Sequence, residues 1–188
     1  MTAILVMLTL PFMAAVTSFL FKNWKIQYAV TLLSAFLHLT VSFAIFTGFY
    51  IPEQFFMFGY DSLSKLFLVV LSNTYFWIVL VSYSYIKLPV ESDSTSGKKY
   101  YFMLMNFYII ANTAAILSNH FAMYWVAAEA TTLSVAPLVY YSRSQESLIA
   151  MWKYLFIVSV GIAFAFIGIL FLALSSKGTV LDGQQLYF

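Results

Sequence analysis

The sequence predicts an all-α integral membrane protein with about six transmembrane helices, and three observations support this fold class. Hydrophobic residues make up 63% of the 188 residues and charged residues only 9%, whereas a soluble domain is roughly a quarter charged. Six apolar stretches are each close to the roughly 20 residues that cross the hydrocarbon core of a bilayer. The stretches are continuous rather than alternating, which favours helices, because a lipid-exposed backbone has to satisfy its own hydrogen bonds.

The six stretches form a single membrane domain. We predict helices at about 3–21, 27–49, 63–86, 100–118, 120–141 and 148–174. A hydrophilic loop is predicted at 88–98, where PVESDSTSG combines turn-forming and helix-breaking residues. The aromatic connection before the third helix is expected to lie at the membrane interface, and Asp61 or Ser62 is expected to cap that helix.

Composition excludes several classes of function. The chain has no cysteine, so it can form no disulfide and can offer no thiolate ligand to zinc or an iron–sulfur cluster. Its net charge of +2 includes no basic stripe, so nucleic acid is not an expected partner. The sequence has no glycine-rich phosphate loop, no Ser–His–Asp pattern and no paired metal-binding carboxylates. We therefore predict no catalytic residue, cofactor or metal, and no catalysis by this chain alone.

The distribution of lysine and arginine predicts the orientation in the membrane. Only two of these residues, Lys65 and Lys177, fall on one side. The opposite side holds Lys22, Lys25, Lys87, Lys98, Lys99 and Arg143, with Lys153 just inside the last helix. Because cytoplasmic connections carry the excess of basic residues, the odd-numbered connections are predicted to be cytoplasmic. The prediction is a multi-pass protein of the inner (cytoplasmic) membrane with both termini on the outer, periplasmic side.

The clearest functional signal is Glu129, in the run NHFAMYWVAAEATTLSVAPLVYY. At about 1.5 Å per residue it lies about 12 Å from Phe121 and about 16 Å from Tyr140, near mid-membrane. A carboxylate there costs about 2.5–3.5 kcal/mol on insertion scales, so we expect it to face the bundle interior and to take part in proton translocation. The alternative is a structural glutamic acid that only hydrogen-bonds a neighbouring helix.

Two further residues are candidates for proton translocation. Lys153 lies about 9 Å into the sixth helix from Ser147, and its ammonium either snorkels to the cytoplasm or points inward towards Glu129. His38 lies near the centre of the second helix, and histidine is the side chain most easily tuned to exchange protons near neutral pH. The alternative for a lone histidine on an apolar helix is a packing or hydrogen-bonding role. His120, at the start of the fifth helix, is expected at the interface.

The run WVAAEATTLSVAPLVYYSRSQESLIAMWKYLFIVSVGIAFAFIGILFL resembles a known family. It is similar to the antiporter-like membrane subunits shared by respiratory complex I, Mrp-type cation/proton antiporters and group 4 membrane-bound hydrogenases. Within that family it most resembles the hydrogenase-4 F-component type, through W-V-x-x-E-A-T-T-L, A-P-L-V-Y and W-K-Y-L over 125–155. The earlier helices match in hydropathy and in the segment D-S-L-S-K-L-F.

The resemblance implies the N-terminal six-helix part of an antiporter-like fold, in a proton-translocating subunit driven by electron transfer in partner subunits. Glu129 would stand at the family's helix-five glutamate and Lys153 at the lysine near the start of helix six. In the family, the lysine that pairs with this glutamate lies on a broken helix seven. The implied partners are the lipid bilayer, other membrane subunits that supply further helices, and peripheral electron-transfer subunits of an oxidoreductase complex.

Two alternatives to proton translocation stay open at this point. The chain could be a non-transporting scaffold that docks peripheral subunits to the membrane, with Glu129 in a structural role. It could also belong to a complex that moves Na⁺ or K⁺ in place of H⁺, because a lone carboxylate does not identify the ion.

Overall fold

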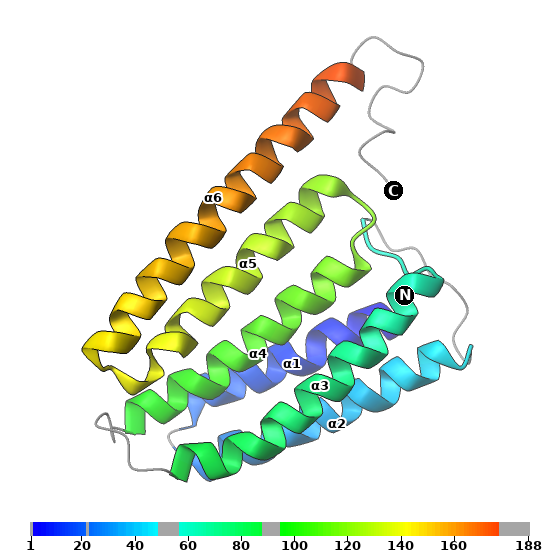
Figure 1. The fold of residues 1–188 in the computed structure, drawn as a ribbon. Helices are drawn as coiled ribbons and strands as arrows, with labels where there is room; N and C mark the ends of the chain where they lie inside the picture. The colour runs from blue at the N-terminus through cyan, green and yellow to red at the C-terminus, as the bar shows by residue number, and fades with distance from the viewer. Residues whose placement is uncertain (1, 22, 49–56, 88–94, 177–188) are drawn as a thin grey trace.

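The computed structural model describes residues 2–21, 23–48, 57–87 and 95–176. It contains six helices that are long and apolar enough to cross a membrane, which confirms the all-α membrane prediction. The helices are α1 (Thr2–Leu20), α2 (Trp24–Phe46), α3 (Ser62–Lys87), α4 (Thr95–Leu117), α5 (Phe121–Val139) and α6 (Gln145–Ser176), with a 3₁₀ turn η1 (Tyr140–Ser142) between the last two (Figure 1).

The predicted loop at 88–98 is too long at its C-terminal end. Residues 95–98 are helical, because α4 begins at Thr95 rather than at about residue 100. Hydropathy detects only the apolar part of a helix, whereas the helical backbone can continue beyond that part through the polar residues TSGKK. Residues 88–94 lie outside the described residues, as do residues 49–56, which make up much of the predicted interfacial segment.

Side-chain caps explain where three helices begin. Asn23 caps α2 and Ser144 caps α6, each through a side-chain oxygen that accepts a nearby backbone N–H at 3.1 Å. Asp61 caps α3, because its Oδ1 accepts the Ser64 N–H at 2.7 Å. At the other end of α2, Gly48 adopts a φ of +80°, a left-handed conformation that glycine takes without strain and that ends the helix.

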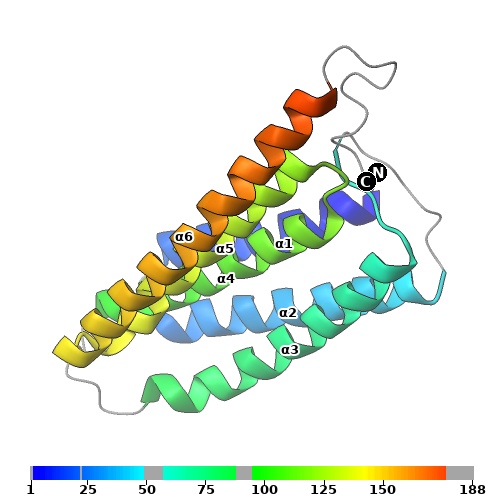
Figure 2. The same cartoon turned by 45° about the horizontal axis from the view of Figure 1, so that its top comes forward.

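Helices α1 to α4 form a four-helix bundle, and the α5–α6 hairpin is attached to its side (Figures 1 and 2). In the bundle α1 packs on α2 and α4, α2 packs on α3, and α4 also touches both α2 and α3. On its other side α4 packs against α5, and α5 packs against α6. Helix α4 is therefore the central element that joins the bundle to the hairpin.

The buried apolar residues form two clusters inside the bundle. One lies where α1 and α3 begin and α2 and α4 end: Ala3, Ile4, Met7, Ile45, Tyr60, Leu68 and Leu117. The other lies mid-span between α2, α3 and α4: Ala35, Tyr75, Val79, Met105 and Ile109. By contrast, none of the α6 span from Gln145 to Ser175 is buried. Both clusters thus lie among the first four helices and the connection that precedes α3.

A short pair of backbone hydrogen bonds fixes the connection that precedes α3. The Gly59 N–H donates to the Leu117 carbonyl and the Asn119 N–H donates to the Met57 carbonyl, both at 2.8 Å. These bonds hold the start of α3 against the turn between α4 and α5. The N-terminal ends of α3 and α5 are consequently placed on either side of the end of α4.

The Asp61 cap predicts a measurable and pH-dependent contribution to stability. Hydrogen bonds from the Ser64 N–H and hydroxyl hold the pKa of the Asp61 carboxyl below its ordinary value of 3.8. Because the folded pKa is the lower one, the stabilisation is present above about pH 4 and is lost as the pH falls through the folded pKa. Asp61→Ala should lower the free energy of unfolding by about 1 kcal/mol, measured by thermal unfolding in detergent.

Asp61→Asn is the matched control, since asparagine caps helices about as well as aspartate but does not titrate. It should keep most of the stability near neutral pH and lose the acid dependence at this position. Equal stabilities of the alanine variant and the parent protein at neutral pH would contradict the assigned cap.

Candidate functional site

Glu129 lies near the middle of α5, as the sequence predicts. It stands eight residues after Phe121 and ten before Val139, or about 12 Å and 15 Å from the two helix ends. The side chain is half-buried, and the neighbouring Ala127 is buried. Small residues on both sides of the carboxylate let α5 approach other helices closely. The structure therefore places an ionisable group at mid-span in a segment suited to close helix packing.

The hydroxyl groups around Glu129 are turned back onto their own helix. The Thr132 Oγ1 donates to the Glu129 carbonyl oxygen at 2.8 Å. Thr131 and Ser134 likewise donate to carbonyls one turn earlier, both at 2.7 Å. Such bonds satisfy the hydroxyls locally and leave them little part in contacts between helices. The Glu129 carboxylate itself has no hydrogen-bond or ion-pair partner among the side chains that the structure describes.

One hydrogen bond fixes the register of α5 against α6. The indole Nε1 of Trp125 donates to the Ile162 carbonyl at 3.0 Å, and the Trp125 ring stacks on Phe166 with 4.6 Å between centroids. Glu129 lies one turn after Trp125, and residues four apart share a helix face. Glu129 is therefore on the side of α5 that meets α6.

Lys153 does not meet Glu129 in this hairpin. Since Trp125 is level with Ile162 and the helices are antiparallel, Lys153 comes level with Ser134, five residues or about 7.5 Å from Glu129 along the axis. Lys153 is also exposed and lies off the stripe of α6 that packs on α5, whose less exposed residues are Leu148, Met151, Leu155, Val158 and Ile162. The lysine therefore points away from the α5–α6 contact.

His38 lies elsewhere, between α2, α3 and α4 within the bundle. Its side chain is fully buried, with 0% relative exposure. The ring Nδ1 is 2.8 Å from the Ser72 Oγ of α3, and the ring Nε2 is 3.2 Å from the Thr113 Oγ1 of α4. His38 thus bonds two other helices at once, and α4 separates it from α5.

The hydrogen-bond network defines the tautomer of His38. The Ser72 hydroxyl donates its proton to the Leu68 carbonyl at 2.7 Å, so its oxygen is left to accept from His38. Nδ1 must then carry the proton, and Nε2 accepts from the Thr113 hydroxyl, because a neutral imidazole has one donor and one acceptor. The bonds run in one direction, from α4 through α2 to α3.

A second polar contact in the same interface was not predicted from the sequence. The Tyr75 hydroxyl donates to the Asn106 Oδ1 at 2.9 Å, and the Asn106 Nδ2 donates to the Thr31 Oγ1 at 3.0 Å and to the Phe102 carbonyl at 2.7 Å. Asn106 is fully buried. An amide in the apolar run FMLMNFYII was the available signal, because an unbonded amide is costly in hydrocarbon.

The fold and the site define a multi-pass all-α membrane protein whose fifth helix carries a half-buried carboxylate at mid-span. Within the described ranges, no group of three or more His, Asp or Glu side chains is arranged to hold a metal ion.

Comparison with known proteins identifies the relatives. The chain is 31% identical over 134 residues to a hydrogenase-4 component F homolog of Methylacidiphilum infernorum, a match that covers 70% of this chain and 28% of the relative. No family model matches the sequence. A match of this extent must include the middle of the chain wherever it begins, so Glu129 lies within it. This match confirms the resemblance to the antiporter-like membrane subunits of the hydrogenase-4 F-component type.

Two solved structures share the fold. A chain of respiratory complex I from Thermus thermophilus with bound aureothin superposes with a TM-score of 0.74 at 18% identity, covering 98% of this chain and 40% of that one. A chain of the membrane-bound sulfane sulfur reductase, an archaeal respiratory membrane complex, superposes with a TM-score of 0.76 at 18% identity, covering 95% of this chain and 38% of that one. The chain therefore spans well under half the length of the proteins that it matches.

The assigned His38 tautomer can be tested directly, because the chain has only two histidines. In His120→Asn protein labelled with ¹⁵N-histidine, His38 should give the single pattern of a neutral ring protonated at Nδ1. Asparagine is chosen because His120 caps α5 through a side-chain acceptor, which asparagine also supplies. A ring protonated at Nε2, or a mixture of tautomers at neutral pH, would show the assignment to be wrong.

Proposed function

We propose that this chain is part of a proton-translocating membrane subunit of an electron-transfer complex of the complex I or membrane-bound hydrogenase kind, and that Glu129 exchanges the proton. The observation that carries the proposal is the half-buried carboxylate at mid-span of α5, within the region that matches the hydrogenase-4 component F homolog. Ionisable residues inside membrane spans are rare and commonly mark proton or ion paths.

The chemistry required of Glu129 is simple. A positive charge that approaches a carboxyl group favours its ionised form, and its withdrawal favours the protonated form. Repeated approach and withdrawal of such a charge therefore unloads and loads one proton per cycle. Because the Glu129 carboxylate has no described side-chain partner, it is free to respond to a charge brought by another element.

The exposure of α6 supports a partner on this side of the molecule. Helix α6 packs on α5 and η1, and none of its span is buried. Large apolar side chains such as Phe156, Ile157 and Phe171 are two-thirds or more exposed. We propose that other membrane subunits supply further helices against this side, and that peripheral electron-transfer subunits drive the complex.

The proposed orientation follows the basic residues. Lys25, Lys87 and Arg143 lie at the end of the bundle where α1, α3 and α5 finish. The positive-inside rule assigns this end to the cytoplasm, in the inner membrane, and leaves both chain termini on the periplasmic side. An external protease or a labelling reagent that reaches the N-terminus of intact spheroplasts would support this assignment.

Glu129→Gln should abolish proton pumping while the complex assembles normally, because glutamine keeps the size and hydrogen bonding of the side chain but cannot exchange a proton. The measurement is electron-transfer-driven acidification in proteoliposomes that contain the purified complex. Glu146→Gln is the matched control, since Glu146 is an exposed carboxylate in the first turn of α6, and it should pump at the parental rate.

The same experiment distinguishes the alternatives. Undiminished pumping by Glu129→Gln with normal assembly would overturn the proposal, and loss of assembly would favour the scaffold role. Uptake of Na⁺ or K⁺ into the same proteoliposomes that persists when a protonophore collapses the proton gradient would identify a different coupled ion.

Lys153 should tune transport rather than carry it. The axial offset of about 7.5 Å, the spacing of packed helices of about 8–10 Å and the outward direction of Lys153 put its charge about 15 Å from Glu129. At an effective dielectric constant of about 20 the interaction is about 1 kcal/mol, equivalent to about fivefold in rate. Lys153→Gln should therefore change the pumping rate by about fivefold or less. Lys65→Gln, the same charge change near the start of α3, is the control and should leave the pumping rate unchanged. Complete loss of pumping in Lys153→Gln but not in this control would show that Lys153 takes a direct part in proton transfer.

A further inference from the structure

A cleft lies along α4, which α3 and α5 flank. Its middle part is lined by all three helices, one end by α3 and Tyr101 of α4, and the other end by α4, α5 and the turn that follows α5. Both outer helices pack on α4 rather than on one another. Three cavities follow this cleft, with volumes of about 540, 280 and 470 Å³. Tyr101 lines all three, Thr74 and Ile78 are shared by the first two, and Leu138 is shared by the last two. The three cavities therefore adjoin one another along the helices, and we treat them as one cleft.

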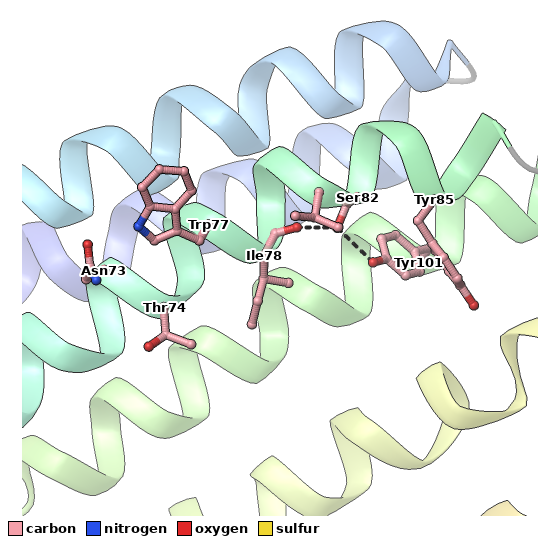
Figure 3. Close-up of a pocket in the computed structure, with 8 residues that line it drawn as sticks. Asn73, Thr74, Trp77, Ile78, Ser82, Tyr85 and Tyr101 are labelled. Carbon is pink, nitrogen blue, oxygen red and sulfur yellow. Dashed lines mark hydrogen bonds between the residues drawn. The ribbon is translucent and has the colours of Figure 1, made fainter.

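The walls of the cleft suit a hydrocarbon chain. Figure 3 shows the first cavity, a groove lined by side chains of α3, among them Trp77, Ile78 and Tyr85, and by Tyr101 of α4. Several of its hydroxyl groups are already bonded: the Ser82 Oγ donates to the Ile78 carbonyl at 2.7 Å and also bonds the Tyr101 hydroxyl at 2.8 Å. The middle cavity is lined by Leu71, Met105, Ile109 and other mainly apolar residues. The walls of the first two cavities are thus mainly apolar and carry no charged residue.

The mouth of the cleft has a different chemistry. Arg143 lines the third cavity, and among the described residues that line the three cavities it is the only charged one. It follows η1 in a left-handed conformation, with φ +54°, and its side chain is exposed. Three tyrosines from α3, α4 and η1 gather at this end, with Tyr85, Tyr101 and Tyr141 rings 5.1 to 6.1 Å apart.

The length of the cleft matches one leaflet of a bilayer. From Tyr85 to Asn73 it follows twelve residues of α3, or about 18 Å, while half of a hydrocarbon core is about 15 Å. Tyrosine and arginine at one end, with apolar walls beyond, are the arrangement found where a helix bundle meets the headgroup level. The cation is therefore at the level of the lipid phosphates.

We propose that this cleft is a binding site for an anionic phospholipid, with its phosphate at Arg143 and one acyl chain along Leu138, Tyr101 and Ile78 towards Asn73. The charge at the mouth selects a negative headgroup, because basic pockets between membrane helices bind anionic lipids on the cytoplasmic side. A helix from another protein does not fit the middle cavity of about 280 Å³, since a helix is about 10–12 Å across. The proposal does not depend on proton translocation by Glu129.

The test measures lipid binding to the full chain, together with any subunits that copurify with it. Phosphatidylglycerol or phosphatidylcholine is added in mixed micelles and bound lipid is followed by native mass spectrometry. The parent protein should bind phosphatidylglycerol about tenfold more tightly than phosphatidylcholine. Arg143→Gln should lose this tenfold preference, a difference of about 1.4 kcal/mol, and Arg143→Lys should recover part of it.

Two further variants locate the site. Lys87→Gln is the matched charge control, because the Lys87 Nζ lies 3.9 Å over the Tyr83 ring and lines none of the three cavities. It should bind as the parent does. Ile78→Trp fills the space shared by the first two cavities and should weaken binding of both lipids.

Four results would overturn the proposal. Equal binding of the two lipids by the parent protein would show that the charge has no role. The same conclusion would follow if Arg143→Gln kept the parental preference for phosphatidylglycerol. Full displacement of the lipid by inorganic phosphate would show a site for free anions rather than for a phospholipid. Unchanged binding in Ile78→Trp would place the lipid elsewhere on the surface.

Discussion

Buried hydrogen bonds from α4 to α2 and α3 are the interactions on which the rest of the bundle depends. Asn106 bonds Thr31 and Tyr75, and Thr113 bonds His38, all at positions without access to solvent. Apolar side chains gain little from leaving lipid for a protein interior, so packing and polar bonds of this kind decide which helices associate and in which register. Helix α4 then provides the surface on which α5 is placed.

The α5–α6 hairpin is held differently. The hydroxyl groups of Thr131, Thr132 and Ser134 donate to carbonyls of their own helix, α5. Among the described residues, the side-chain hydrogen bond from α5 to α6 is that of Trp125 to the Ile162 carbonyl. Apolar contacts, and small residues that allow close approach, otherwise hold the two helices together. Glu129 therefore lies in the part of the molecule with fewer hydrogen bonds between helices, next to α6, which packs mainly on α5 and of whose span no residue is buried. This position suits the proposed role, because a carboxylate that has to respond to an approaching charge needs surroundings that are less tightly hydrogen-bonded than the bundle interior.

Glu129 and His38 show which parts of the candidate site could be predicted from the sequence. Both are ionisable residues in apolar runs and became candidates without a structure, Glu129 through its cost in hydrocarbon and His38 through the ease with which histidine exchanges protons near neutral pH. Their surroundings could not be predicted, because hydropathy does not say which faces of two helices meet. His38 is bonded by α3 and α4, which are distant in sequence, whereas Lys153, on the helix adjacent to Glu129, points away from it.

The sequence by itself determined the fold class, the six helices and the mid-span carboxylate, because bilayer thickness and the cost of charge in lipid act on each segment separately. Of the helix caps, the sequence analysis predicted Asp61 at the start of α3 but not Asn23 of α2 or Ser144 of α6. Tertiary structure alone decided the central place of α4, the partners of Asn106, the direction of Lys153 and the cleft that ends at Arg143. Each of these depends on the relative rotation and register of helices, which contacts between distant residues set and which no single segment encodes.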